Sequence, residues 1–242
     1  MPDSIYEPDL GSLEATKLWL RSVLGTYSFG VQGILLADGT VLPLPSESAL
    51  IAKLIEVTLL QRFRTVALAV RGLTIDGAPS GRVYPDIMLS GLRLNHKKVG
   101  LDVKAARRAP RGLRTVSRIT LGPYDKYFRF PDRKMAGSWI PYGEIDWHLD
   151  VIVLYDYLGG VITNVEPLVV ETWRVASRVR SSGTRQYMGA VMEIDRLRKE
   201  RGDFDSADAF YEHWRNHPLT RAALDQSAPE EQPEALLGLD ES

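Results

Sequence analysis

Residues 84–89 read YPDIML, and residues 98–105 read KVGLDVKA. Both stretches are apolar, and the Gly- and Asn-containing residues between them favour a turn, so we expect two neighbouring strands. Side chains alternate along a strand, which places Asp102 and Lys104 on one face and their apolar neighbours on the other. If the two strands pair, Asp86 converges with this acid and this lysine.

Two carboxylates and a lysine in this arrangement suit the hydrolysis of a phosphodiester. A divalent metal needs clustered carboxylates, which Asp86 and Asp102 offer. Attack by water also needs a positioned nucleophile, and Lys104 can help with that task. A structural alternative stays open, in which Asp86 ends a loop and Asp102 and Lys104 belong to an ordinary exposed strand pair. The apolar neighbours weaken that alternative, because a charge at the edge of a core needs a reason.

A further acid, Glu56, lies in the clearest predicted helix, residues 46–63, where apolar residues recur at helical spacing. Its neighbours one turn away place it at the edge of the apolar face. Carboxylates are rarely buried unless they are paired or bound to metal, so Glu56 is a candidate for the same site. The alternative is a boundary glutamate that pairs with Lys53 or reaches solvent.

The composition is that of an ordinary globular protein, with 242 residues, 44% of them hydrophobic and 25% charged. The absence of cysteine excludes disulfides, thiolate zinc sites and cysteine nucleophiles, and is compatible with a reducing cytoplasm. No signal peptide and no membrane-spanning apolar run is visible. The histidines lack metal-ligand spacing, and no GxSxG, Walker A or GxGxxG motif occurs.

The charges are unevenly distributed, although the formal net charge is only −1. Between residues 93 and 134 the basic residues far outnumber the acidic ones, which suits a polyanionic substrate beside a metal site. A solvated loop face is the alternative. Residues 226–242 contain acids but no Lys or Arg, and we expect a disordered acidic tail there, after a single domain over residues 1–225.

The remaining pattern predicts a mixed fold. We expect helices at residues 12–24, 46–63, 188–199 and 205–216. We expect further strands at residues 29–36, 41–44, 65–70, 151–157 and 167–175, and loops at 72–82 and 178–186. Asp38 and Gly39 predict a hairpin turn between the first two of these strands. Strands grouped in the middle, with helices before and after, indicate an α/β sandwich of the α+β or α/β class.

Three landmarks, in order and spacing, resemble the EcoRV-like type II restriction endonucleases of the PD-(D/E)xK superfamily. They are GTVLPL at residues 39–44, the two motif strands followed by ITLGPY at 119–124, and FDSADAF at 204–210 with WRN at 214–216. The resemblance covers roughly residues 12–216. It implies a mixed central β-sheet flanked by helices. It also implies that Asp86 and Asp102 bind metal, that Lys104 is the catalytic lysine and that Glu56 is an accessory acid at the metal site.

The resemblance also implies partners. Such an enzyme is a Mg²⁺-dependent homodimer that cuts both strands of a short palindrome in double-stranded DNA. It leaves 5′-phosphate and 3′-hydroxyl ends, here expected to be blunt, and works beside a cognate DNA methyltransferase. The two-fold symmetry of the protein mirrors that of the site. The loop with Gly81 and Arg82 would lie near the minor groove. The major-groove loop would use Ser182, Gly183, Thr184, Arg185 and Gln186.

This second loop departs from the family pattern, because Arg185 stands in place of a small polar residue. Arginine suits guanine O6 and N7, or a phosphate, so both contacts stay open and recognition of GATATC does not follow. Two other functions also stay open: a repair or junction-resolving nuclease on the same scaffold, and a DNA-binding protein without catalysis. The complete set of Glu56, Asp86, Asp102 and Lys104 argues against the second.

Overall fold

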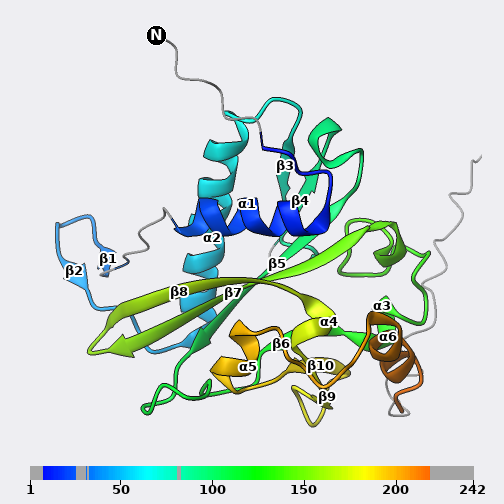
Figure 1. The fold of residues 1–242 in the computed structure, drawn as a ribbon. Helices are drawn as coiled ribbons and strands as arrows, with labels where there is room; N and C mark the ends of the chain where they lie inside the picture. Colours follow the sequence, from blue (N-terminus) through cyan, green and yellow to red (C-terminus); the bar gives the residue numbers. More distant parts are fainter. Residues whose placement is uncertain (1–7, 26–30, 32, 81–82, 219–242) are drawn as a thin grey trace, which may run out of the picture.

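The computed structural model describes residues 8–25, 31, 33–80 and 83–218. A five-stranded sheet forms the centre, with the strand order β3-β4-β5-β7-β8 (Figure 1). Its strands are β3 (Thr74–Gly77), β4 (Ile87–Ser90), β5 (Val99–Arg107), β7 (Trp147–Leu158) and β8 (Val161–Glu171). Strands β5 and β7 run parallel and the other neighbours run antiparallel, so the sheet is mixed.

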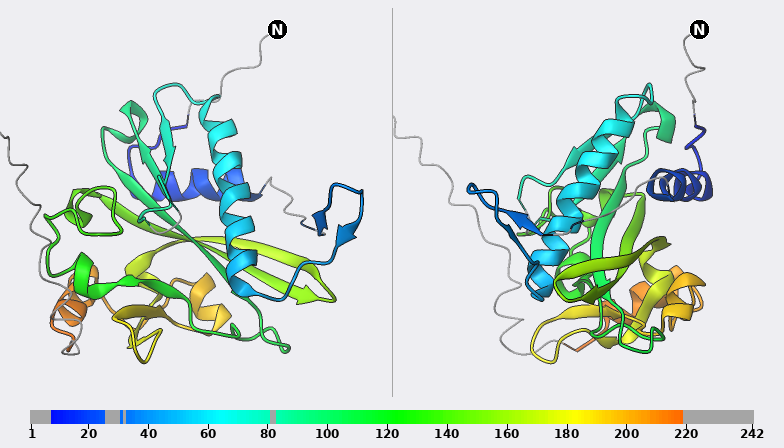
Figure 2. Two further views of the ribbon diagram at one scale, coloured as in Figure 1. Left: turned by 180° about the vertical axis from the view of Figure 1, so that it is seen from behind. Right: turned by 90° about the vertical axis from the view of Figure 1, so that its left-hand side faces the viewer.

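One face of the sheet packs against the two long helices, α1 (Leu13–Gly25) and α2 (Ser48–Ala67). Every second strand residue, such as Leu101 and Val151, joins their apolar side chains in one hydrophobic core. Helix α1 begins where expected, because the Ser12 hydroxyl accepts a hydrogen bond from the Ala15 N–H (3.2 Å). In Figures 1 and 2, α1 lies above β7 and β8, and α2 runs lengthwise across the sheet.

The other face packs against a second layer, seen below β7 and β8 in Figures 1 and 2. A three-stranded antiparallel sheet forms part of it: β6 (Thr120–Pro123), β9 (Ala176–Arg180) and β10 (Tyr187–Ala190), in the order β6-β10-β9. Its helices are α3 (Tyr124–Tyr127), α4 (Thr172–Val175), α5 (Ile194–Arg198) and α6 (Ala207–Arg215). Two 3₁₀ turns, Leu92–Leu94 and Tyr142–Glu144, connect the strands of the central sheet. Ile152 and Leu154, which alternate with the residues of the first core, belong to this second core. The even-numbered side chains of β5 and β7 therefore face the second layer, and a cleft lies between the two layers there.

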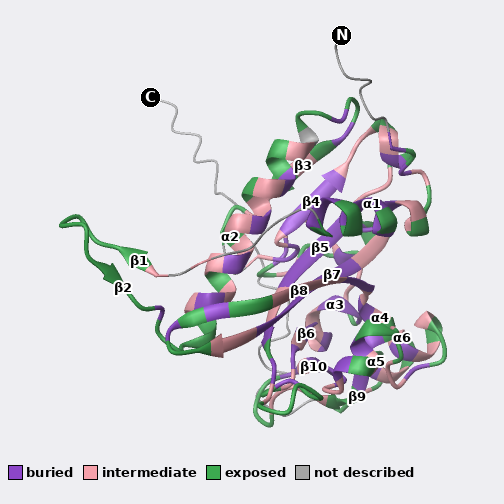
Figure 3. Cartoon of the chain, turned by 60° about the vertical axis from the view of Figure 1, so that its left-hand side comes forward, coloured by how far each residue is buried: buried purple, intermediate pink, exposed green. Residues whose placement is uncertain are grey.

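A short hairpin, β1 (Ile34–Leu35) with β2 (Val41–Leu42), projects from the body and is largely exposed (Figure 3). It confirms the turn predicted at Asp38 and Gly39, although its strands are shorter than expected. The Leu44 N–H donates to the Gly160 carbonyl oxygen (3.1 Å), which ties the base of the hairpin to the turn between β7 and β8.

The mixed α+β class, with a central sheet flanked by helices, is confirmed. Five local predictions are wrong. The loop predicted at 178–186 is shorter than expected, since residues 178–180 belong to β9. Residues 65–70 are not a strand, since α2 continues to Ala67, and the predicted loop 72–82 contains β3. Residues 188–199 are not one helix, because β10 inserts between β6 and β9 and only the segment of α5 is helical. The strand predicted at 167–175 ends at Glu171 and continues as α4.

The expected tail at residues 226–242 lies outside the described residues, and the extent of the domain stays a prediction. Within the described ranges, no helix is both long and apolar enough to cross a membrane.

Candidate active site

Strand register brings three aspartates into one row. Between β4 and β5, Ile87 lies opposite Leu101, so Asp86, one residue before the strand, lies next to Asp102. On the other side of β5, the parallel register places Asp102 opposite Asp150 of β7. We call Asp86, Asp102 and Asp150 the aspartate row. It lies on the sheet face that packs against the second layer.

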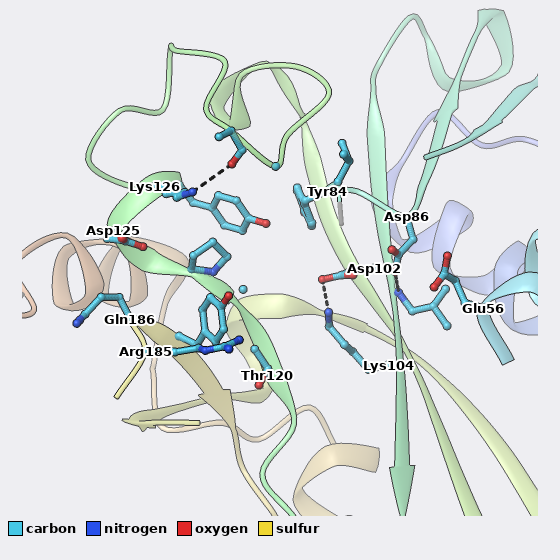
Figure 4. A pocket seen from close by; sticks show the side chains of 18 of the residues that line it. Glu56, Tyr84, Asp86, Asp102, Lys104, Thr120, Asp125, Lys126, Arg185 and Gln186 are labelled. Carbon is cyan, nitrogen blue, oxygen red and sulfur yellow. Dashed lines mark hydrogen bonds and ion pairs between the residues drawn. The ribbon is translucent and has the colours of Figure 1, made fainter. Parts of the chain in front are cut away.

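The row is held by two polar contacts, shown in part in Figure 4. The Val103 N–H donates a hydrogen bond to Oδ2 of Asp86 (2.7 Å) across the strand pair. Nζ of Lys104 lies 2.6 Å from Oδ2 of Asp102. Lys104 follows Asp102 by two residues in β5, so alternation puts the ammonium on the same face as the carboxylates. The structure therefore brings together the acid–acid–lysine set that the sequence predicts.

The carboxyl groups of the row lie close together in a buried place, which shifts the pKa values of Asp86 and Lys104. Burial, together with the neighbouring Asp102, raises the pKa of Asp86 to about 8. Burial alone would lower the pKa of Lys104, but Asp102, Asp86 and Asp150 outweigh it and raise this pKa above its ordinary value. The ammonium therefore stays charged, while one cation is shared among three acids.

The row opens into a cleft of about 890 Å³ between the central sheet and the second layer. Its lining includes Glu56, Asp86, Asp102 and Lys104 on the sheet side. The opposite side carries residues from β6, α3 and the loop before β10, such as Thr120 and Arg185 (Figure 4). Catalytic candidates and the predicted base-reading loop thus border one cavity, although the loop lies about eighty residues further along the chain.

Glu56 has features of both alternatives predicted for it, an acid of the metal site and a boundary glutamate that pairs with Lys53. It lines the cleft from α2, beside the row. It also pairs with Lys53 one turn earlier, with Nζ and Oε1 2.5 Å apart, and its side chain is 20% exposed. A carboxylate that already has a partner is available to the cleft only if that exposed ion pair opens.

The loop at residues 181–186 connects β9 to β10. The Ser182 hydroxyl accepts hydrogen bonds from the N–H groups of Thr184 (3.3 Å) and Arg185 (3.1 Å), which fixes a tight turn. Gly183, Thr184 and Arg185 are exposed. Gln186 differs: it is buried, and its side-chain carbonyl accepts a hydrogen bond from the Tyr124 hydroxyl. We infer that Gln186 anchors the end of the loop. Gly81 and Arg82 lie outside the described residues.

Sequence reasoning missed Asp150. It stands in the apolar run LDVIVLY of residues 149–155, and a lone acid inside such a run is the signal that could have found it. Its partner Asp102 is forty-eight residues away, and only the parallel register of β5 and β7 reveals the pair. Burial and Asp102 raise the pKa of Asp150 to about 7.

Aromatic residues pack behind Tyr84, which lines the cleft. Tyr84 forms a hydrogen bond with Nδ1 of His148 (2.6 Å), and the His148 ring stacks on Tyr142 with centroids 3.8 Å apart. Burial lowers the pKa of His148 to about 3, so the imidazole is neutral at physiological pH. His148 is therefore a packed and hydrogen-bonded residue.

The donor set fits a magnesium-type cation. Among the described residues, no group of three or more His, Cys, Asp or Glu side chains is arranged to hold a metal without help. Mg²⁺, however, is typically bound by one or two carboxylates, with water and substrate phosphates completing the shell. Asp86 and Asp102 border the cleft side by side, and burial together with Asp102 raises the pKa of Asp86, a shift that a bound cation would oppose.

Comparison with known proteins agrees with this geometry. The sequence model of the family described as "Restriction endonuclease EcoRV" matches residues 25–234, which include the row, Glu56 and the loop. The type II restriction enzyme EcoRV of Escherichia coli is 22% identical over 208 residues, which cover 79% of this chain and 84% of that enzyme. The chain therefore belongs to the EcoRV restriction endonuclease family, a family of nucleases.

Proposed function

We propose that the protein is a type II restriction endonuclease that cuts both strands of a short palindrome in double-stranded DNA, with Mg²⁺ as its cofactor. The products would carry 5′-phosphate and 3′-hydroxyl ends and be blunt. The observation that supports this most is the cleft itself, where two carboxylates, a charged lysine and an exposed, arginine-bearing loop face one another. Membership of the EcoRV family supports the same reaction.

Asp86 and Asp102 are the proposed metal ligands. When bound there, Mg²⁺ supplies positive charge that stabilises the scissile phosphate during hydrolysis. The Val103 N–H fixes the Asp86 carboxylate, so this ligand is oriented before any substrate arrives. Lys104, oriented by Asp102, holds its proton and can donate hydrogen bonds to the attacking water or to a phosphate oxygen. Glu56 would serve the site from the side, after leaving Lys53.

DNA would enter between the sheet and the second layer. Arg185 and Thr184 are the exposed loop residues that border the cleft, so they are the proposed contacts to bases or backbone in the major groove. Ser182 and Gly183 would shape the turn that presents them. The Arg185 guanidinium lies 5.9 Å from the centre of the Tyr187 ring, which holds it near the cleft wall. The minor-groove role of Gly81 and Arg82 remains a proposal from the family resemblance.

A second copy of the chain is the proposed partner of an exposed apolar end. The hairpin exposes Leu35 (71%) and the adjacent β7–β8 turn exposes Leu158 (80%), and the two segments are joined through Gly160. Exposed large apolar side chains of this kind are common at interaction sites. A two-fold dimer would match a palindromic target. We also propose cytoplasmic action and a cognate methyltransferase that protects the same site.

Digestion of a plasmid with and without Mg²⁺ tests the proposal. We expect a fixed set of fragments that depends on Mg²⁺, disappears with a chelator and is absent with Asp102→Asn. Sequencing of the ends should show one palindrome and blunt 5′-phosphorylated termini. Cleavage restricted to branched or damaged DNA would favour a repair nuclease. Binding without cleavage under any divalent metal would favour an inactive DNA-binding protein.

A further inference from the structure

Asp150 lies deeper than the other members of the aspartate row. It is fully buried (0% exposed), and neither carboxylate oxygen has a hydrogen bond of good geometry in the described part of the protein, although the Thr172 hydroxyl lies near enough to offset part of the rise in the pKa of Asp150. The nearby Thr172 hydroxyl donates to the His148 carbonyl oxygen (3.4 Å) instead. Burial of a carboxylate without such partners is costly, and an apolar residue of similar size would avoid the cost. Packing alone therefore does not explain why an aspartate occupies this position.

Arg108 is a buried charge that direct contacts satisfy. It donates to the Asn164 carbonyl oxygen (2.6 Å) and to Glu166 (2.6 Å) from a position that is 8% exposed. Among the described residues, Asp125 has one buried oxygen without a hydrogen-bond partner, and Asp150 is the carboxylate for which this is true of both oxygens. Asp150 therefore lacks the kind of ion pair that compensates Arg108.

The surroundings of Asp150 connect it to the cleft. It lies opposite Asp102, the carboxylate that pairs with Lys104, in the parallel register of β5 and β7. Lys104 is the one ammonium that forms an ion pair with any member of the row, as far as the chain is described. Three acids therefore share one base, and Asp150 lies directly behind a proposed metal ligand.

We infer that Asp150 is a positioning residue of the metal site, whose buried charge behind Asp102 strengthens the hold of the row on a divalent cation. This inference rests on the proposed function. Asp150 is not placed as a ligand, because the row does not form a three-acid metal cluster. It acts through Asp102 and Lys104, by adding negative potential in a region that water does not screen.

The test is a titration of the full-length protein with Mn²⁺, with free Mn²⁺ measured by electron paramagnetic resonance in the absence of DNA. We expect Asp150→Asn to weaken Mn²⁺ affinity by about 10–100-fold, the usual effect of removing a group that supports a metal ligand. The melting temperature should stay level or rise, since the change removes a buried charge. Asp156→Asn is the matched control: it makes the same change on the same strand at a position that is 41% exposed, and should leave Mn²⁺ affinity unchanged.

The outcomes separate this inference from the proposed function. If the wild type binds Mn²⁺ and cuts DNA, but Asp150→Asn binds Mn²⁺ equally well, the inference is overturned and the proposed function stands. If the wild type neither binds Mn²⁺ nor cuts DNA, the proposed function itself fails. If Asp150→Asn does not fold, Asp150→Leu is titrated instead, and a folded variant with weakened affinity supports the inference. Failure of both variants to fold would make Asp150 a structural residue and overturn it.

Discussion

Two buried charge clusters in this protein are built in opposite ways. The first surrounds Lys17 of α1, which is 3% exposed and lies 2.9 Å from Glu200 and 3.4 Å from Glu171. Arg21 pairs with Glu200 (2.9 Å) and Arg174 with Glu171 (2.6 Å), so each acid has its own bases. The second cluster is the aspartate row, where three acids share Lys104.

This difference in charge balance indicates a different role for each cluster. In the Lys17 cluster, charges from α1, β8 and the segment after α5 are balanced within the fold, so its contacts serve to join those elements. The aspartate row is unbalanced, and the raised pKa of Asp86 records the cost of that imbalance. A balanced cluster is complete without a ligand, whereas an unbalanced one is completed by a cation from solution.

The largest expected effect is loss of catalysis in the unbalanced cluster. Asp102→Ala or Lys104→Ala should lower the cleavage rate at least about a thousandfold, or roughly 4 kcal/mol of barrier, because a metal ligand or its partner is lost. Single-turnover cleavage measures the rate, and circular dichroism shows that the variant is folded. A rate near that of the wild type for Asp102→Ala would remove this residue from the site.

The balanced cluster should respond in stability instead. Lys17→Met removes the central partner of Glu171 and Glu200, which keep Arg174 and Arg21, and should lower the free energy of unfolding by about 1–3 kcal/mol. Urea denaturation measures the loss, and the cleavage rate of the folded variant should not change. A variant as stable as the wild type, or one that is folded but inactive, would contradict the contrast between the two clusters.

Arg185 lies on the side of the cleft opposite the aspartate row, and a substitution there tests which contact it makes with DNA. A bidentate contact to guanine contributes about 1–3 kcal/mol of discrimination, so Arg185→Ala would relax preference at one base pair. A phosphate contact would weaken binding to all sequences and reduce the salt slope by about one unit. Cleavage of single-base variants, and binding against salt, distinguish the two, with Arg174→Ala as a control outside the cleft. No change in either would place recognition elsewhere.

The smallest expected effect belongs to Glu56. Glu56→Ala should lower the cleavage rate less than Asp102→Ala does, by about tenfold or roughly 1.4 kcal/mol of barrier, since this acid serves the site from the side. Lys53→Ala is the control, because it removes the ion pair but keeps the acid. A loss equal to that of Asp102→Ala would make Glu56 a primary ligand, and no loss would leave it a surface residue.

The sequence predicts the part of the site that depends on local geometry. Asp102 and Lys104 share a face because strand alternation requires it, and Asp86 joins them because the next strand pairs antiparallel. Asp150 could not be placed in this way, since its neighbour is set by a parallel pairing across forty-eight residues.

The same reasoning applies to the fold. Helices α1 and α6 were predictable from their serine caps and apolar spacing. Strand β10 was not, because Met188 and Ala190 are buried in a sheet whose strand β6 lies more than sixty residues earlier, with Met188 opposite Gly122. Long-range pairing overrides local preference there.

The most direct test of the central claim is a crystal of the protein soaked in Mn²⁺, with anomalous scattering used to locate the ion. The surplus charge of the aspartate row predicts a peak between the carboxylates of Asp86 and Asp102, and no peak at the balanced Lys17 cluster. An active preparation whose crystals show the ion elsewhere, with the row empty, would contradict the claim that the unbalanced acids form the metal site.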